Sequence, residues 1–211
     1  MEFMEAVKAR KSVRDYTDRP VADEDLREVV ELAGRAASWC NAQPRKAYAV
    51  RGEALGRIRE EWGKRLAAEA PTEMDFEGVH REDMTELAAA NMGGFFGTVA
   101  PYLEAGTMAP QVLYGAPVVL ILTVPKDASQ YAMYDLGAFA EQLMLAAADK
   151  GISSLVAAMF VAYPDVLRAE LPIPDDEAVA IGIGLGYASD AETNGIATAR
   201  MALDDYLTVC E

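Results

Sequence analysis

The most constraining feature of this sequence is a continuous apolar run, APVVLILTV, at residues 116–124. The run is rich in β-branched residues, which favour strands, and it is too short to cross a bilayer. A strand of this kind has no polar face to turn toward water, so both of its faces are expected to be buried. The run therefore predicts a strand in the interior of a covered sheet.

Hydrophobic periodicity places further helices and strands around this run. Helices are predicted over 2–9, 21–37, 53–70, 132–150 and 163–171. Strands are predicted over 46–52, 116–124, 153–160 and 177–188. This order of elements indicates an α+β protein or a mixed α/β sandwich.

The last predicted strand has one large face and one small face. The large face holds Val179, Ile181, Ile183, Leu185 and Tyr187, and the small face holds Ala180, Gly182, Gly184 and Gly186. A face of small residues lets a helix or a second backbone approach closely. The glycines repeat every second residue within a strand, so they do not form a G-x-G-x-x-G nucleotide loop.

Glycine and proline interrupt every long pattern between residues 70 and 114. Both residues disfavour a helix interior, so this stretch is predicted to contain only short helices and loops.

Composition excludes several classes of function. The net charge is −15, whereas nucleic acids and anionic membranes require a basic surface. Cys40 and Cys210 are the only cysteines and make no disulfide framework. The charged N-terminus does not resemble a secretory signal, so a cytoplasmic protein is expected. The single histidine, His80, has no G-x-S-x-G motif or zinc-ligand spacing around it, which argues against hydrolytic and zinc chemistry.

Cations gather in ARKSVRDY, where the first helix ends and an extended segment begins. Arg10, Ser12 and Arg14 alternate, so an extended backbone turns them to one side. Two guanidinium groups and a hydroxyl can bind a phosphate, although cations at a helix C-terminus are also favourable without any ligand. Arg200 is the only basic residue after Arg168, and it can join such a site from a distant part of the chain.

The loop SWCNAQPR combines three hydrogen-bonding side chains, those of Ser38, Asn41 and Gln43, with a proline at its exit. Such residues are common in turns, where they have no ligand. Amides also supply both donors and acceptors to a polar heterocycle. Both interpretations are open from the residues alone.

Together these segments resemble the nitroreductase family of FMN-dependent oxidoreductases. The resemblance rests on four stretches in the family's order, which begin at Ala9, Asp135, Leu171 and Asn194. They read ARKSVRDYTDRPVADEDLREVVELAGRAASWCNAQPRKAYAV, DLGAFAEQLMLAAADKGISSL, LPIPDDEAVAIGIGLGYASD and NGIATARMALDDYL. The resemblance implies an α+β fold with a mixed β-sheet flanked by helices and an intertwined homodimer. It also implies one FMN-binding domain over 1–211, with a variable substrate-side segment around 63–114.

The resemblance assigns FMN contacts to residues of this chain. The phosphate and ribityl side would be held by Arg10, Lys11, Ser12, Arg14 and Arg200. The flavin ring would be bordered by Ser38, Trp39, Asn41 and Gln43, some of them from a partner subunit. Ala157 and Ala158 would make main-chain contacts, because this chain lacks the Pro and Glu that some relatives have there. No acid–base residue is expected, because the cofactor carries the chemistry.

The activity implied is reduction of nitroaromatics, quinones or similar small acceptors by NADH or NADPH in a two-step hydride relay. Two other functions stay open. One is a related flavin enzyme that removes halogen or dehydrogenates a ring, although Trp62 stands where a tyrosine would help a dehalogenase. The other is a flavin-binding protein with little turnover. A domain without any cofactor is a third alternative.

Overall fold

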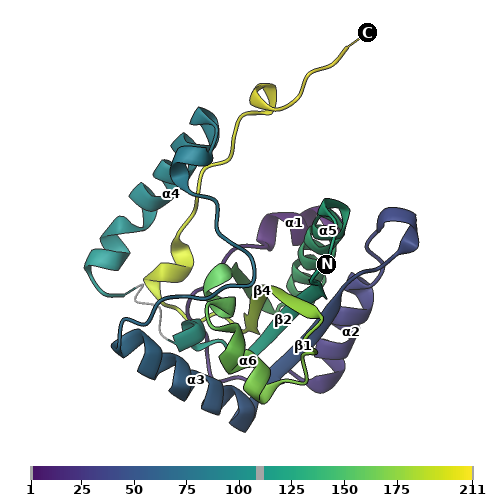
Figure 1. Ribbon diagram of the computed structural model, residues 1–211. Helices are drawn as coiled ribbons and strands as arrows, with labels where there is room; N and C mark the ends of the chain where they lie inside the picture. Colours follow the sequence, from purple (N-terminus) through teal and green to yellow (C-terminus); the bar gives the residue numbers. More distant parts are fainter. Residues whose placement is uncertain (1, 108–111, 211) are drawn as a thin grey trace. The chain divides into compact units, whose positions relative to one another are not determined.

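The computed structural model describes residues 2–107 and 112–210 of the chain (Figure 1). These residues form two compact units. The first comprises residues 2–77 and 112–194, and the second comprises 78–107 and 195–210. Each unit is described by itself, and the single domain expected from the sequence stays a prediction.

The first unit is built on a four-stranded sheet. Its strands are β1 Lys46–Arg51, β2 Val118–Pro125, β3 Ser153–Ala157 and β4 Glu177–Gly186. Their order in the sheet is β1-β2-β4-β3, and all neighbouring strands are antiparallel. In the described residues the only parallel pairing is an isolated bridge between Ser12 and Ser154. The predicted α+β class is confirmed, and the mixed character of the sheet is limited to this bridge.

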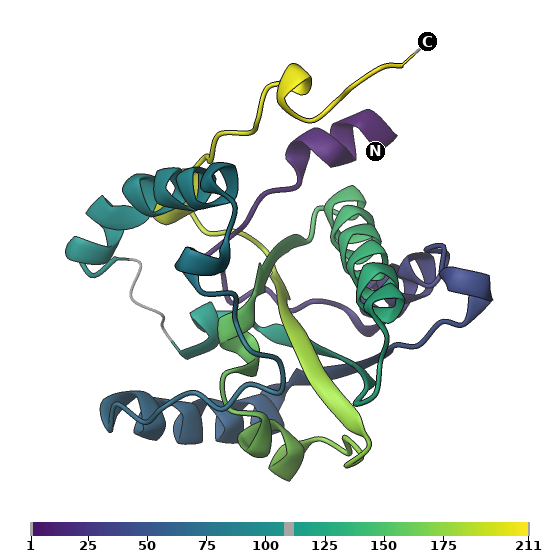
Figure 2. The same ribbon diagram turned by 45° about the horizontal axis from the view of Figure 1, so that its top comes forward.

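Helices cover both faces of the sheet (Figure 2). They are α1 Phe3–Ala9, α2 Asp23–Ala33, α3 Gly52–Ala67, α5 Gln130–Asp149 and α6 Pro164–Glu170. α2 and α5 pack on one face, with α1 against α5, while α3 and α6 pack on the other. β2 alternates between the two cores and is buried over all its residues except Pro125, as predicted for the apolar run. None of the helices among the described residues is long and apolar enough to cross a membrane.

Two aromatic side chains, Phe160 and Tyr16, fill the space beside the glycines of β4, where the sequence predicted the close approach of a helix or a second backbone. A Cβ added at Gly182 would lie 2.1 Å from the Cβ of Phe160, and one at Gly186 would lie 2.6 Å from the Tyr16 ring. Phe160 is fully buried there. Glycine is therefore required at these positions because side chains from outside the sheet occupy the space of its missing Cβ.

Two residues of β4, Val179 and Ala180, face the opposite side from the predicted one, and Ala180 packs against the core that contains Ile183. The register shifts between Leu122 and Thr123, which pair with Ile181 and Val179, so Ala180 is an extra residue in β4. Such a bulge reverses the alternation of faces. Val179 therefore packs in the core that contains Phe160, and not with Ile183.

Other elements also differ from the predictions, and the helix predicted over 21–37 ends at Ala33. The strand predicted over 153–160 ends at Ala157, where the 3₁₀ turn η4, Ala158–Val161, begins. The stretch predicted to hold only short helices contains α4 Glu86–Glu104, a helix of 19 residues in the second unit. Thr85 caps it by accepting the Ala88 N–H, and Pro101 removes only one hydrogen bond near its end. Glycine and proline lower helix stability residue by residue, but they did not outweigh the remaining helical sequence.

We predict that Gly182→Ala lowers the free energy of unfolding by about 2–3 kcal/mol, because the new methyl group must displace Phe160. Gly56→Ala is the matched control, since a Cβ at this position in α3 meets no atom within 4 Å. The control is expected to stabilise the protein by up to about 1 kcal/mol, as alanine does in helices. Urea unfolding of both variants measures the difference, and equal changes would contradict the packing described for β4.

Candidate functional site

The cation-rich segment after α1 is extended, as predicted, and lies along the sheet. The Val13 N–H donates to the Ser154 carbonyl at 2.9 Å, and the Thr17 N–H donates to the Tyr187 carbonyl at 2.8 Å. The Val13 side chain is buried, whereas its neighbours Ser12 and Arg14 are half-buried. The chain therefore holds these two side chains at the surface from a backbone attached to β3 and to the residues after β4.

Arg14 is a half-buried cation that has no anionic partner among the residues that the structure describes. Its Nη1 donates to the Ser12 carbonyl at 3.1 Å, and no carboxylate among the described residues forms an ion pair with it. Burial lowers the pKa of the Arg14 guanidinium, while the nearby hydroxyls of Tyr114 and Tyr16 act in the opposite direction. Burying a charge is costly unless it is paired, so an anion bound here would be favourable.

The other two cations of the segment have partners. Arg10 Nε lies 3.4 Å from Glu141 Oε1 on α5, and Lys11 Nζ donates to the Asn194 carbonyl at 2.7 Å. A hollow of about 180 Å³ lies beside both residues and is also lined by Ser153 and Ser154. Arg10 is thus held by a carboxylate, and only the rest of its guanidinium is available to a phosphate.

Asn194 organises this segment, and the sequence analysis did not identify it. Its Oδ1 accepts the N–H groups of Arg14 and Asp15 at 2.8 and 3.2 Å, and its Nδ2 donates to the carbonyls of Asp15 and Ser189 at 2.8 and 3.1 Å. The side chain is buried, so each of these bonds is shielded from water. An asparagine 180 residues from its partner leaves no local pattern that would have revealed this role.

The loop after α2 has an unusual backbone. Cys40, Asn41 and Gln43 have φ values of 48°, 58° and 50°, in the left-handed region that few side chains favour. The Ser38 hydroxyl accepts the Gln43 N–H at 3.2 Å, and Gln43 Nε2 donates to Asn41 Oδ1 at 3.1 Å. Ser38 therefore stabilises the turn itself, whereas the amides of Asn41 and Gln43 are exposed next to each other.

The exposed Trp39 ring stacks on Tyr131, with ring centroids 5.8 Å apart. Ala157, the last residue of β3, pairs with Gly182, and Ala158 opens η4. The first N–H groups of a helical turn have no partner within it. The predicted main-chain contact would use such a group.

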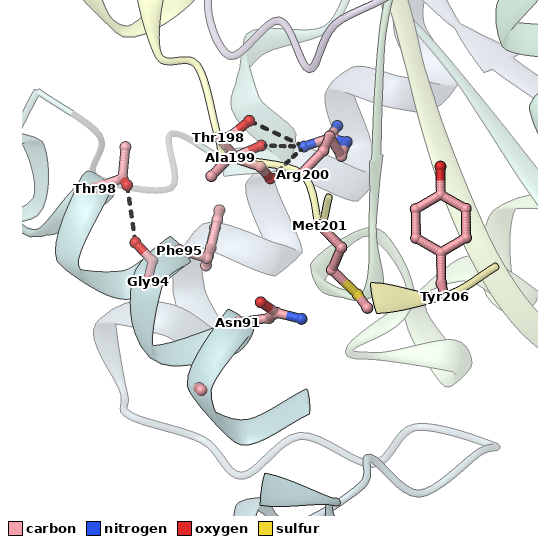
Figure 3. Close-up of a pocket in the computed structure, with 10 residues that line it drawn as sticks. Asn91, Gly94, Phe95, Thr98, Thr198, Ala199, Arg200, Met201 and Tyr206 are labelled. Atoms are coloured by element: carbon pink, nitrogen blue, oxygen red, sulfur yellow. Dashed lines mark hydrogen bonds between the residues drawn. The ribbon is translucent and has the colours of Figure 1, made fainter. Parts of the chain in front are cut away.

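Arg200 lies in the second unit, beside a cavity of about 670 Å³ (Figure 3). The cavity is lined by α4 residues that include Asn91 and Phe95, and by the C-terminal segment that includes Met201 and Tyr206. Arg200 is exposed, and its Nη1 donates to Thr198 Oγ1 at 2.7 Å. Its predicted approach to Arg10 and Arg14, which belong to the first unit, stays a prediction.

A second cluster of charged and polar groups has a structural role. Glu177 is buried and accepts hydrogen bonds from Lys46, from Tyr48 at 2.8 Å and from Thr123 at 2.6 Å. Burial alone would raise the pKa of Glu177, but these donors outweigh it and the pKa lies below its usual value. A carboxylate that is ionised and fully engaged in this way is a poor acid or base.

Comparison with known proteins identifies relatives along nearly the whole chain. A sequence model of the nitroreductase family matches residues 7–187. Nitroreductase NfnB of Mycolicibacterium smegmatis is 32% identical, with 94% of this chain and 88% of the relative covered. Nitrobenzene nitroreductase of Ectopseudomonas oleovorans is 28% identical, with coverages of 96% and 94%. Among solved structures, the FMN-dependent nitroreductase NfnB of Mycobacterium smegmatis in complex with NADPH superimposes with a TM-score of 0.89 at 29% identity, covering 99% of this chain and 97% of that one.

We predict that Asn194→Ala lowers the free energy of unfolding by about 2–4 kcal/mol, because it leaves buried N–H and carbonyl groups of the cation-rich segment without partners. Asn91→Ala is the control, since Asn91 is exposed and such surface changes stay within about 0.5 kcal/mol. Thermal unfolding of both variants measures this difference. Similar melting temperatures would show that Asn194 does not hold the segment.

Proposed function

This chain belongs to the nitroreductase family, and from that premise we propose that it is an FMN-dependent oxidoreductase. It takes electrons from NADH or NADPH and reduces nitroaromatics, quinones or similar small acceptors. The observation that carries the proposal is the half-buried Arg14 guanidinium, which has no carboxylate partner among the described residues. A phosphate is an anion that would complete such a site.

The residues of this chain suit FMN in both charge and polarity. The phosphate is assigned to the cation-rich segment and to Arg200, and the ring to the loop after α2 and the end of β3. In full, the proposed contacts are Arg10, Lys11, Ser12, Arg14, Ser38, Trp39, Asn41, Gln43, Ala157, Ala158 and Arg200. FMN, when bound, supplies hydride transfer from the nicotinamide to the acceptor.

The protein's own part is to bind and orient. The exposed amides of Asn41 and Gln43 offer donors and acceptors to the polar edge of the ring. The cations assigned to the phosphate favour negative charge on the bound group. His80 is exposed and Glu177 is already engaged, so protons are expected to come from water.

The names of the relatives favour a nitroaromatic acceptor. Curated relatives include a nitrobenzene nitroreductase and a 4-nitrobenzoate reductase of Nocardioides, 28% identical to this chain. A flat acceptor of this kind can stack on the same ring that receives the hydride. We therefore place a nitroaromatic first among the acceptors, ahead of quinones.

We also propose that the protein is an intertwined homodimer in which each flavin contacts both subunits. In support, α1 exposes Phe3 and Met4, and α5 exposes Tyr134, with 69%, 60% and 76% of their surfaces accessible. The C-terminal segment separately exposes large apolar side chains, namely Leu203, Tyr206, Leu207 and Val209. α1 packs against α5, so exposed apolar side chains on these two helices can form one interaction surface.

A cytoplasmic location is proposed as well. Cys40 and Cys210 are free and exposed, which suits a reducing compartment. The net charge of −15 supports a small-molecule substrate in preference to a nucleic acid or an anionic membrane.

The purified protein is expected to be yellow, and Arg14→Ala and Arg200→Ala are each expected to weaken FMN binding by at least about tenfold, the usual value of a hydrogen bond to a charged group. Fluorescence titration of apoprotein with FMN measures the dissociation constant. Arg57→Ala is the control, since Arg57 pairs with Glu170 on the surface. If Arg14→Ala and Arg200→Ala bind FMN as tightly as Arg57→Ala does, the phosphate site proposed for Arg14 and Arg200 is wrong.

Turnover separates the proposal from the other flavin functions. Stopped-flow mixing with NADH or NADPH is expected to reduce the bound flavin rapidly, and 4-nitrobenzoate is expected to reoxidise it rapidly. Halide release from a halogenated aromatic would indicate a dehalogenase. Slow reduction by both nicotinamides would indicate a binding protein.

Sedimentation is expected to give a dimer, and Phe3→Glu on α1 is expected to raise its dissociation constant by at least tenfold, because a charge at an apolar interface costs more than about 1.4 kcal/mol. Ala67→Glu introduces the same charge at an exposed position of α3 and serves as the control. A wild-type monomer that binds FMN tightly would disprove the proposed interface.

A further inference from the structure

Asp135 is a buried carboxylate on α5, with 2% of its surface exposed. Both of its oxygens accept the same backbone N–H, that of Trp39, at 3.1 and 3.0 Å. No lysine or arginine among the described residues forms an ion pair with it. Burying a carboxylate without a cation is costly, so the Trp39 N–H is an important partner for it.

The segment that begins at this hydrogen bond is strained. Three of the four residues that follow Trp39, namely Cys40, Asn41 and Gln43, have left-handed backbones although none is glycine. Residues in sparsely populated backbone conformations persist only where the surrounding structure over-determines them. The hydrogen bonds inside the loop join it to itself, whereas the bond to Asp135 joins it to the long helix α5.

The anchor does not serve to bury the Trp39 side chain. The indole is 59% exposed, and its stacking partner Tyr131 is 61% exposed. What Asp135 fixes is the main chain at the start of the loop, immediately after Ser38 and two residues before Asn41. The position of the exposed amides therefore depends on a group that they do not touch.

We propose that Asp135 is a positioning residue for the flavin site, which fixes the Trp39 N–H and thereby holds Ser38, Asn41 and Gln43 in the arrangement that contacts the ring. This inference rests on the proposed function, because the loop's ligand is the FMN assigned there. In this role Asp135 acts through the main chain of the loop, and not by contact with the flavin or by proton transfer.

Two substitutions at Asp135 test the inference in the full-length apoprotein. Asp135→Leu removes both acceptors in a similar volume and is expected to weaken FMN binding by at least about tenfold. Asp135→Asn keeps one acceptor oxygen for the Trp39 N–H and is expected to stay within about threefold of wild type. FMN titration gives the dissociation constants, and the visible spectrum of the bound flavin reports the polarity around the ring.

Leu143→Ala is the matched control for stability. Leu143 is a fully buried residue on the same helix and lies outside the loop contact. Its truncation is expected to lower the melting temperature and to leave the FMN affinity of the folded protein unchanged. Hydrogen exchange of residues 36–43 in the apoprotein is expected to accelerate in Asp135→Leu and not in Leu143→Ala, which detects the anchor without any flavin.

Two substitutions at Trp39 test the donor of the same hydrogen bond. Trp39→Pro removes the N–H at the first position of a 3₁₀ turn, where proline is tolerated, and Trp39→Ala removes the indole alone. The proline variant is expected to bind FMN about tenfold more weakly than the alanine variant. This pair decides the question if Asp135→Leu does not fold.

The outcomes separate the two proposals. A wild type that does not bind FMN would overturn the proposed function and this inference with it. A wild type that binds FMN, together with equal affinities in Asp135→Leu and wild type or in Trp39→Pro and Trp39→Ala, would overturn the inference and leave the proposed function intact. If Leu143→Ala loses as much FMN affinity as Asp135→Leu, the role of Asp135 is purely structural and the inference is wrong.

Discussion

The close approach of Phe160 and Tyr16 to the glycine face of β4 is the constraint on which the rest of the first unit depends. A sheet covered on both faces has to exclude water from both, and here one face is closed by side chains that occupy the space of missing Cβ atoms. Tyr16 belongs to the extended segment that carries Arg10, Lys11, Ser12 and Arg14. Packing of the sheet and placement of the cations are therefore parts of one arrangement.

That arrangement needs polar support as well as packing. Asn194 joins the end of the first unit to the backbone of Arg14 and Asp15, and Asp135 joins α5 to the backbone at Trp39. Both side chains are buried, and both bind main-chain groups instead of other side chains. Each lies next to a segment assigned to FMN, where the order of the backbone decides what the exposed side chains can reach.

The sequence predicted the elements whose signals are local. The apolar run of β2, the periodic helix α5 and the glycine positions of the small face of β4 follow from the physics of single segments, and the structure confirms them. The bulge at Ala180 was not predicted, because register depends on a neighbouring strand. The helix α4 was not predicted, because glycine and proline lower helix stability without forbidding a helix. The roles of Asn194 and Asp135 were not predicted, because their partners lie 180 and 96 residues away.

The roles of Asn194 and Asp135 were not predicted for the same physical reason. A buried polar side chain is tolerated only if it is hydrogen-bonded, and an irregular loop offers main-chain donors that no helix or strand has used. A buried polar side chain from elsewhere in the fold can therefore hold an irregular loop by binding its main chain. For the loop after α2 that partner is Asp135, so its strained turn is held by the rigid helix that also forms the core beneath the sheet.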